Sequence, residues 1–187
     1  DSTNPNTIYY SGTDDIDDFT STGSGTVKLD DKVIGIRSFR NDLIIFCKNS
    51  IYKLANINSS SAIVVTPITK NVGCLDNHSI QEIGGDLVFL SPDGIRTIAG
   101  TVRIGDVELS SVSRQIQPII NSIANSIDTY VISSLVIRSK SQYRLFYTTT
   151  AEDSSGAKGI IGSLTSNGFE WSETKGIQCR ASTSGFN

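Results

Sequence analysis

The densest group of side chains that could do chemistry is acidic. Asp14, Asp15, Asp17 and Asp18 fall within five consecutive residues. Calcium binds several carboxylate oxygens on a flexible loop, so these four residues are the candidate metal ligands of the chain. The run lacks the glycine and the distal glutamate of an EF-hand loop, and a solvated connector between two strands would have the same composition. We expect no other metal site and no cofactor.

A second set of residues could in principle act in catalysis. The only histidine, His78, could pair with the neighbouring Asp76, but the sequence indicates neither a nucleophile nor further metal ligands, so His78 is interpreted as a turn residue. Two carboxylates can also act together in glycoside hydrolysis. The best placed acids, Asp42, Asp86 and Asp93, fall in predicted turns, where the backbone favours aspartate. We therefore expect no catalytic residue and predict that the chain is not an enzyme.

The cysteines and glycines indicate no further site. Cys47, Cys74 and Cys179 are odd in number and far apart, which argues against a disulfide framework and against a CxxC zinc site. We expect reduced thiols, with Cys47 as a small buried side chain. Residues 100–106 (GTVRIGD) contain two glycines, but they are expected in a hairpin and not at the start of a phosphate-binding helix.

Composition and charge exclude several classes of protein. The 187 residues include 16 basic and 19 acidic side chains, for a net charge of −3, and no segment concentrates Lys and Arg. This distribution argues against a dedicated nucleic-acid or membrane surface. Apolar runs of about five residues are too short for a transmembrane helix. Because the sequence has no methionine, we expect it to be a piece of a longer protein.

An internal repeat organises most of the chain. Residues 36–46 (IRSFRNDLIIF) align without a gap on residues 80–90 (IQEIGGDLVFL), about 44 positions later. That offset lies within the spacing of propeller blades. A looser third copy covers residues 130–147. Each copy is expected to contain strands joined by tight turns, with a nearly all-apolar second strand that is covered on both faces.

The repeat predicts an all-β fold. We expect a β-propeller, or a propeller segment, of about four four-stranded blades with one inserted amphipathic helix, in a single domain over residues 1–187. The expected blades, and the split blade at the two ends, lie at about 33–70, 78–110, 130–173, and 1–30 together with 176–187. Residues 177–182 are predicted to form an inner strand of that split blade. A β-sandwich is the main alternative.

One segment has the periodicity of a helix. Its apolar positions are Ile116, Ile119, Ile120, Ile123 and Ile127. This spacing predicts an amphipathic helix over about 113–127, inserted between the second and third units. Ser113 could cap its start, and Pro118 is tolerated near the first turn. The apolar stripe is expected to pack on its own domain, although docking on a partner is the alternative.

Several of these runs resemble segments of one known family. Residues 4–11 (NPNTIYYS) with 17–19 (DDF), and residues 33–36, 39–46 and 50–54, are similar to consecutive parts of virion propeller proteins. The most specific match is formed by residues 71–74 (NVGC) and 84–95 (GGDLVFLSPDGI). The chain resembles the tail nozzle, or tail tubular, proteins of short-tailed bacteriophages. The resemblance covers residues 4 to about 125 well and the rest in general character.

The resemblance implies a structural role in the virion. In that family several copies form a ring or tube for DNA exit at the end of the tail, and fibres or adaptors attach around it. We therefore expect copies of the chain itself and other tail proteins as partners, passage of DNA without specific binding, and no membrane. The expected location is the virion tail, with assembly in the host cytoplasm. Family members are much longer than this chain, and no catalytic residues come with the family.

Two other functions remain as alternatives. One is a receptor- or carbohydrate-binding module of a tail or fibre protein, which would gather exposed aromatic residues on one face. Its candidate residues are Tyr9, Tyr10, Tyr143, Tyr147 and Trp171. The other is a propeller hydrolase, which the lone histidine and the missing acid/base pair disfavour.

Overall fold

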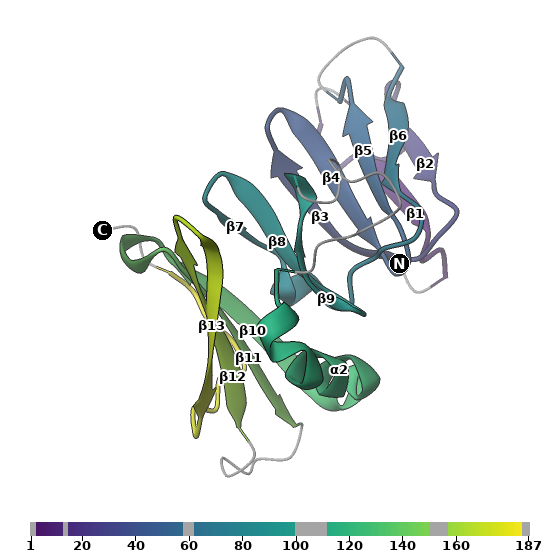
Figure 1. Cartoon of the computed structure of the whole chain (residues 1–187). Coiled ribbons are helices and arrows are strands. Elements are labelled where there is room, and N and C mark those ends of the chain that lie inside the picture. The colour runs from purple at the N-terminus through teal and green to yellow at the C-terminus, as the bar shows by residue number, and fades with distance from the viewer. Residues whose placement is uncertain (1–2, 13–14, 58–61, 100–111, 150–156, 185–187) are drawn as a thin grey trace.

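The computed structural model describes residues 3–12, 15–57, 62–99, 112–149 and 157–184. In these residues the chain is mostly β, with strands grouped into four antiparallel sheets that follow the order of the sequence. Figure 1 shows the sheets one after another across the molecule, from the purple hairpin at one end to the green and yellow sheet at the other. The prediction of an all-β chain is therefore confirmed.

The N-terminal part contains two sheets. The first sheet pairs β1 (Thr7–Tyr10) with β2 (Gly25–Lys28). The second sheet has four strands in sequence order: β3 (Val33–Phe39), β4 (Asp42–Cys47), β5 (Ile51–Ala55) and β6 (Val64–Thr69). It occupies the region in which the repeat predicts a blade at 33–70.

The rest of the chain adds two sheets and the helical segment. The third sheet consists of β7 (Gln81–Ile83), β8 (Asp86–Ser91) and β9 (Gly94–Thr97), after the 3₁₀ turn η1 (Asn77–Ser79). The fourth sheet consists of β10 (Tyr130–Ile137), β11 (Gln142–Thr149), β12 (Lys158–Thr165) and β13 (Gly168–Lys175). The predicted hairpin at 100–106, and the end of the expected blade 78–110, lie outside the described residues.

The two best copies of the repeat turn in the same way. Arg40 and Asn41 have φ of 50° and 67°, and Gly84 and Gly85 have φ of 61° and 74°. Two consecutive positive φ values define the type I′ turn, whose twist matches that of the flanking strands. Each turn leads from the first strand of its sheet into the second, as the aligned sequences predict.

The second strands are covered on both faces, as expected from their apolar sequence. Along β4, Ile45 and Cys47 face the first sheet, whereas Ile44 and Phe46 face the third sheet. The rings of Phe46 and Phe89 meet there, with centroids 5.1 Å apart. Leu87 and Phe89 of β8 point back to the second sheet, and the alternate residues Val88 and Leu90 point to the fourth. Each hydrophobic cluster thus lies between two consecutive sheets.

The helical segment is shorter and less regular than predicted. It consists of η2 (Arg114–Ile116), α2 (Gln117–Asn125) and η3 (Ile127–Thr129). Ser113 makes no capping hydrogen bond, so that prediction is wrong. Its hydroxyl instead accepts the backbone N–H of Ile95, at 2.9 Å, and so serves the third sheet. Ile116, Ile120 and Ile123 pack between the third and fourth sheets, which confirms packing on the chain's own core.

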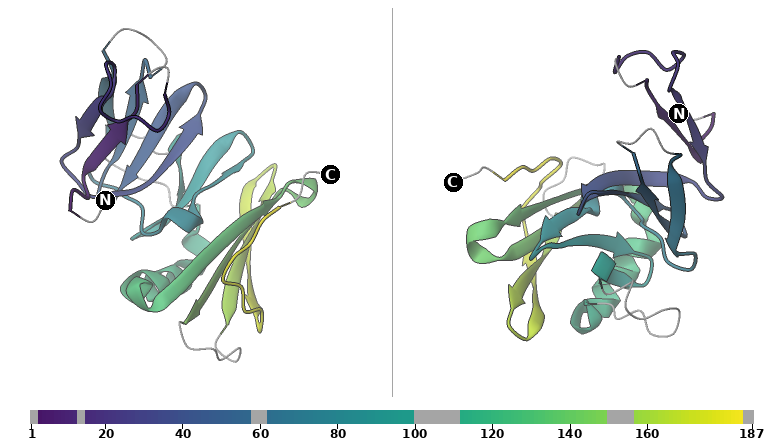
Figure 2. Two further views of the ribbon diagram at one scale, coloured as in Figure 1. Left: turned by 180° about the vertical axis from the view of Figure 1, so that it is seen from behind. Right: turned by 90° about the horizontal axis from the view of Figure 1, so that it is seen from above.

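The prediction of a strand at 177–182 is wrong. Residues 176–184 contain no strand, although the segment passes along the fourth sheet (Figure 2). Ser182 contacts Ser133 and Ser134 of β10 through its hydroxyl group. Because these contacts are made by side chains, they do not impose the backbone ladder of a strand.

Candidate functional site

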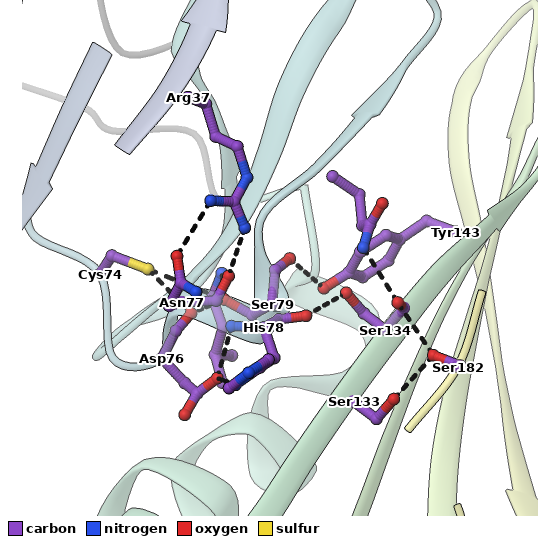
Figure 3. A network of polar contacts seen from close by, with 12 residues as sticks. Arg37, Cys74, Asp76, Asn77, His78, Ser79, Ser133, Ser134, Tyr143 and Ser182 are labelled. Atoms are coloured by element: carbon purple, nitrogen blue, oxygen red, sulfur yellow. Dashed lines mark hydrogen bonds and ion pairs between the residues drawn. The ribbon is translucent and has the colours of Figure 1, made fainter. Parts of the chain in front are cut away.

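Three sheets meet at the short turn η1, and a polar network lies at this meeting point (Figure 3). We call it the junction network; its members are Arg37, Asp76, Asn77, His78, Ser79, Ser133, Ser134, Tyr143 and Ser182. The second sheet contributes Arg37, the fourth contributes the residues of β10 and β11, and η1 leads into the third. The network therefore connects elements that are far apart in the sequence.

The turn η1 is defined by its own side chains. Asp76 is the N-cap, and its Oδ1 accepts the backbone N–H of His78 at 2.7 Å. Aspartate is favoured at such a position because it satisfies a backbone donor that the turn leaves unpaired. Ser79 Oγ donates to the carbonyl oxygen of Asp76 at 2.6 Å and accepts the N–H of Leu90 at 3.1 Å. These bonds fix η1 onto the third sheet.

Arg37 attaches the second sheet to this turn. Its Nη1 donates to Asn77 Oδ1 at 3.0 Å, and its Nη2 donates to the carbonyl oxygen of Asn77 at 2.9 Å. The planar guanidinium can bind both acceptors at once, which a lysine ammonium could not do with the same geometry. Nη1 also donates to the carbonyl oxygen of Ile36, at 2.8 Å.

The fourth sheet reaches the same turn from the other side. Tyr143 Oη donates to the carbonyl oxygen of Ser79 at 2.8 Å, and Ser134 Oγ donates to the carbonyl oxygen of His78. Gln81 at the start of β7 donates in turn to the carbonyl oxygen of Ser134, at 2.9 Å. Two consecutive carbonyl groups of η1 are therefore bonded by side chains of β10 and β11.

Apart from the Arg37 guanidinium and the Asp76 carboxylate, the network consists mainly of hydrogen bonds between neutral groups. Burial raises the pKa of the Cys74 thiol to about 12, so that it is protonated at neutral pH. Burial also raises the pKa of Tyr143. The hydroxyls of Ser79 and Ser134 donate to backbone carbonyls, which occupies the proton that a nucleophilic serine would have to give to a base. These hydrogen bonds can hold the second, third and fourth sheets in fixed positions relative to one another.

The side chains of His78, Asp15 and Asp18 make their hydrogen bonds with near neighbours in the sequence. His78 Nδ1 lies 3.2 Å from Asp76 Oδ1, the pair that the sequence indicates, and the His78 side chain is mostly exposed. Asp15 accepts the N–H of Asp17, and Asp18 accepts two N–H groups and a hydroxyl in its own turn. The hydrogen bond from the Thr20 hydroxyl, with those of the backbone, lowers the pKa of Asp18.

Of the candidate calcium ligands, the carboxylates of Asp15 and Asp18 thus accept hydrogen bonds from their own loop. Asp14 lies outside the described residues. Among the residues that the structure places, no cluster of three or more His, Cys, Asp or Glu side chains could hold a metal ion.

The three acids in predicted turns each serve their own sheet. Asp42 pairs with Lys53 across the second sheet, at 3.3 Å. Asp86 accepts the N–H of Ala99, and Asp93 pairs with Arg96. Each carboxylate has a partner in its own unit, as expected for residues that stabilise turns.

Only part of the aromatic set is exposed. Tyr143 and Tyr147 are buried in the core, and the half-buried Trp171 stacks on Phe169 and donates to the carbonyl oxygen of Val112 at 2.6 Å. Tyr9 is 44% exposed. It lines a groove of about 760 Å³ between β1 and β3. Ile8, Phe19, Val33 and Ile36 also line this β1–β3 groove.

Sequence reasoning missed the central residues of the junction network. Arg37, Asn77 and Ser134 were assigned no role, although two signals were present. Arg37 is a charged residue within an inner strand, and Ser133 and Ser134 interrupt the apolar strand Tyr130–Ile137. Polar residues at such positions need partners when they are buried.

Comparison with known proteins assigns the chain to no family. No protein-family profile matches the chain, and no curated protein of similar sequence was found. Of the helices described, none is long and apolar enough to cross a membrane.

Proposed function

We propose that the four sheets are consecutive parts of a β-propeller and that the chain is a non-enzymatic structural component of a bacteriophage tail. The observation that carries the proposal is the stacking of consecutive sheets, with β4 and β8 covered on both faces. Radial repetition of such sheets would produce a stiff body with few free sheet edges. Such a body suits a ring or platform around a channel.

The junction network supports a role in which shape matters. It ties the second, third and fourth sheets together through buried and half-buried hydrogen bonds, so that the sheets cannot move independently without breaking them. The resemblance to tail nozzle proteins supports the same role and indicates copies of the chain and other tail proteins as partners.

The charge distribution fits a channel through which DNA slides. Affinity for nucleic acid comes mainly from Lys and Arg at phosphate groups. With 16 basic and 19 acidic residues and no basic segment, the surface would let DNA pass without holding it. The proposed location is the virion tail, after assembly in the host cytoplasm.

Purified particles test this function. The protein that contains this chain is expected among their components by mass spectrometry, and antibodies against the chain should label the tail. Absence from the particles, together with a strictly monomeric protein, would overturn the proposal.

The receptor- or carbohydrate-binding alternative has lost part of its basis, because Tyr143 and Tyr147 are buried. Specific binding to a glycan array, abolished by Tyr9→Ala, would favour it over the structural role. Turnover of a sialoside or polysaccharide would favour the hydrolase alternative.

A further inference from the structure

We propose that the β1–β3 groove binds a neutral saccharide, with the rings of Tyr9 and Phe19 as the surfaces on which a sugar ring lies. The inference goes beyond the structural role and does not rest on it. It concerns a surface that the junction network does not use. It also gives the carbohydrate-binding alternative a definite site, in which Phe19 takes the place of the buried Tyr143 and Tyr147.

The exposed aromatic residues of the described chain gather in this groove. Tyr9 on β1 is 44% exposed, Phe19 in the following loop is 54% exposed, and both line the groove. Every other aromatic side chain that the structure describes is buried or half-buried. Large aromatic side chains gain free energy when they are covered. Two exposed rings in one groove therefore indicate a surface that a ligand covers.

The ring of Tyr9 is held in place before a ligand arrives. Asn4 Nδ2 donates to Tyr9 Oη at 3.0 Å, and Asn4 itself lines the groove. A side chain whose position is already fixed loses less conformational entropy on binding. The hydroxyl can still donate its own proton to a ligand, because the bond from Asn4 uses an acceptor position of the oxygen.

The backbone of β1 presents polar groups at the same place. The N–H of Leu29 donates to the carbonyl oxygen of Asn6 at 2.9 Å, so these two residues form a hydrogen-bonded pair. Such pairs alternate along an antiparallel ladder, and the N–H and C=O of Tyr9 therefore point away from β2. The groove is lined by β1, β3 and their adjoining loops and by no residue of β2, so both groups lie at its edge.

This combination of groups fits a sugar. A pyranose ring carries C–H groups on one face, and these are attracted to the negative face of an aromatic ring. Its hydroxyls both donate and accept hydrogen bonds, and the side chains of Asn4 and Thr7 and the backbone of Tyr9 offer both kinds of group at the groove. The groove volume of about 760 Å³ lies in the range of small-molecule sites.

Charge and exposure narrow the class of ligand. Of the described residues that line the groove, Lys32 alone is charged, whereas an acidic sugar would favour several cations. Because Tyr9 and Phe19 face water, a ligand on them stays hydrated on its other side, which suits hydroxyl groups better than a wholly apolar molecule. A proline-rich segment also binds aromatic grooves, but its prolines have no N–H to donate to the carbonyl of Tyr9.

A saccharide array followed by NMR titration tests the site. The full chain is applied to an array of neutral and sialylated oligosaccharides, and the neutral saccharide that binds most tightly is then titrated. We expect binding to neutral saccharides, with saturation transferred from the protein to the C–H protons of one face of the sugar ring. That pattern distinguishes stacking on aromatic rings from contacts made only by hydroxyl groups.

Variants of the two rings separate stacking from apolar contact. Tyr9→Ala and Phe19→Leu are each expected to weaken binding by about tenfold, because each removes a ring. Phe19→Tyr keeps the ring and should bind within about threefold of the unaltered chain. Val64→Ala on β6 is the control and should bind as the unaltered chain does, since Val64 is 47% exposed and does not line the groove. Circular dichroism checks that all variants are folded.

Several results would overturn the inference: no binding of neutral saccharides at millimolar concentration, binding that Tyr9→Ala and Phe19→Leu leave unchanged, a preference for sialylated saccharides, or ring-dependent binding of deca-proline in place of a sugar. If the protein is found in the tail but binds no saccharide, the structural role stands and the site is wrong. If the two rings bind a saccharide but the protein is absent from particles, the virion role is wrong and the site remains.

Discussion

Tyr143 and Ser79 are 64 positions apart, and Tyr143 Oη donates to the carbonyl oxygen of Ser79 at 2.8 Å. Both residues are completely buried. The hydroxyl of Ser79 meanwhile accepts the N–H of Leu90 on β8. A single residue of η1 therefore connects the third and fourth sheets, and this link should contribute measurably to stability.

Removing the tyrosine hydroxyl tests that link. Tyr143→Phe leaves the buried carbonyl of Ser79 without this donor, and we expect the free energy of unfolding to fall by about 1–2 kcal/mol. Urea denaturation at pH 7 measures the change. Tyr130→Phe on the same sheet is the control, since Tyr130 is half-exposed, and it should stay within about 0.5 kcal/mol of the unaltered chain. Equal losses in the two variants would show that the Tyr143–Ser79 hydrogen bond contributes nothing to stability.

Because Cys47 and Cys74 are buried thiols, we expect the free energy of unfolding to fall at alkaline pH. Burial raises the pKa of Cys74 from 9.0 to about 12, so between these values the unfolded chain is ionised while the folded chain keeps the proton. Stability is fully present below pH 9 and falls by about 1.4 kcal/mol per pH unit for this thiol as pH rises toward 12. The pKa of Cys47 is likewise raised to about 12 by burial and by Asp31.

In Cys74→Ala the free energy of unfolding should fall less steeply with rising pH, because the ionisation of one thiol no longer contributes to the fall. Urea unfolding is followed from pH 7 to pH 10.5. The difference between the two proteins at pH 7 reports lost packing, and the change in that difference with pH reports ionisation. Parallel curves would contradict the prediction.

Because Asp93 forms an ion pair with Arg96, we expect the free energy of unfolding to fall at acidic pH. Burial alone would raise the pKa of Asp93, but the hydrogen bonds and charge of Arg96 outweigh it and hold the pKa below its usual value of 3.8. The stability that this pair supplies is present above that value and is lost as pH falls through the lower pKa of the folded state.

Asp93→Asn leaves Arg96, only 4% exposed, without its carboxylate. We expect a loss of about 2 kcal/mol at pH 7 and a shallower decline below pH 4 than in the unaltered chain. Asp17→Asn in an exposed turn should change stability by less than about 0.5 kcal/mol at pH 7. An acid profile of Asp93→Asn that matches that of the unaltered chain would refute the assignment.

Gly73 is placed where no side chain fits. A Cβ atom there would lie 2.1 Å from the carbonyl oxygen of Lys48, a backbone atom at the β4–β5 turn. Gly73→Ala must move backbone and should cost more than about 3 kcal/mol. Gly85→Ala meets no atom within 4 Å and carries only the penalty of its positive φ, about 1 kcal/mol. Thermal unfolding of both variants measures the difference, and similar losses would argue against the clash.

Much of the fold follows from local pattern. The polar runs at 40–41 and 84–85 predict tight turns, and the apolar runs of β4 and β8 predict cover on both faces; the structure has both. The site was less predictable. Arg37 and Asn77 are 40 positions apart, and no local signal links their side chains. Ser113 looked like a helix cap because its sequence neighbours are helical, but its partner is Ile95 on β9.

The sequence by itself determined the all-β class, the position of the tight turns and the apolar face of the helix. These depend on period, on backbone sterics and on side chains within a few residues of one another. Only the tertiary structure decided which sheets share a core, where the carbonyl groups of η1 find their donors, and that residues 177–182 lack a ladder partner. Those properties depend on which distant groups approach one another, because a buried polar group is stabilised by whichever donor or acceptor the packing of the sheets brings to it.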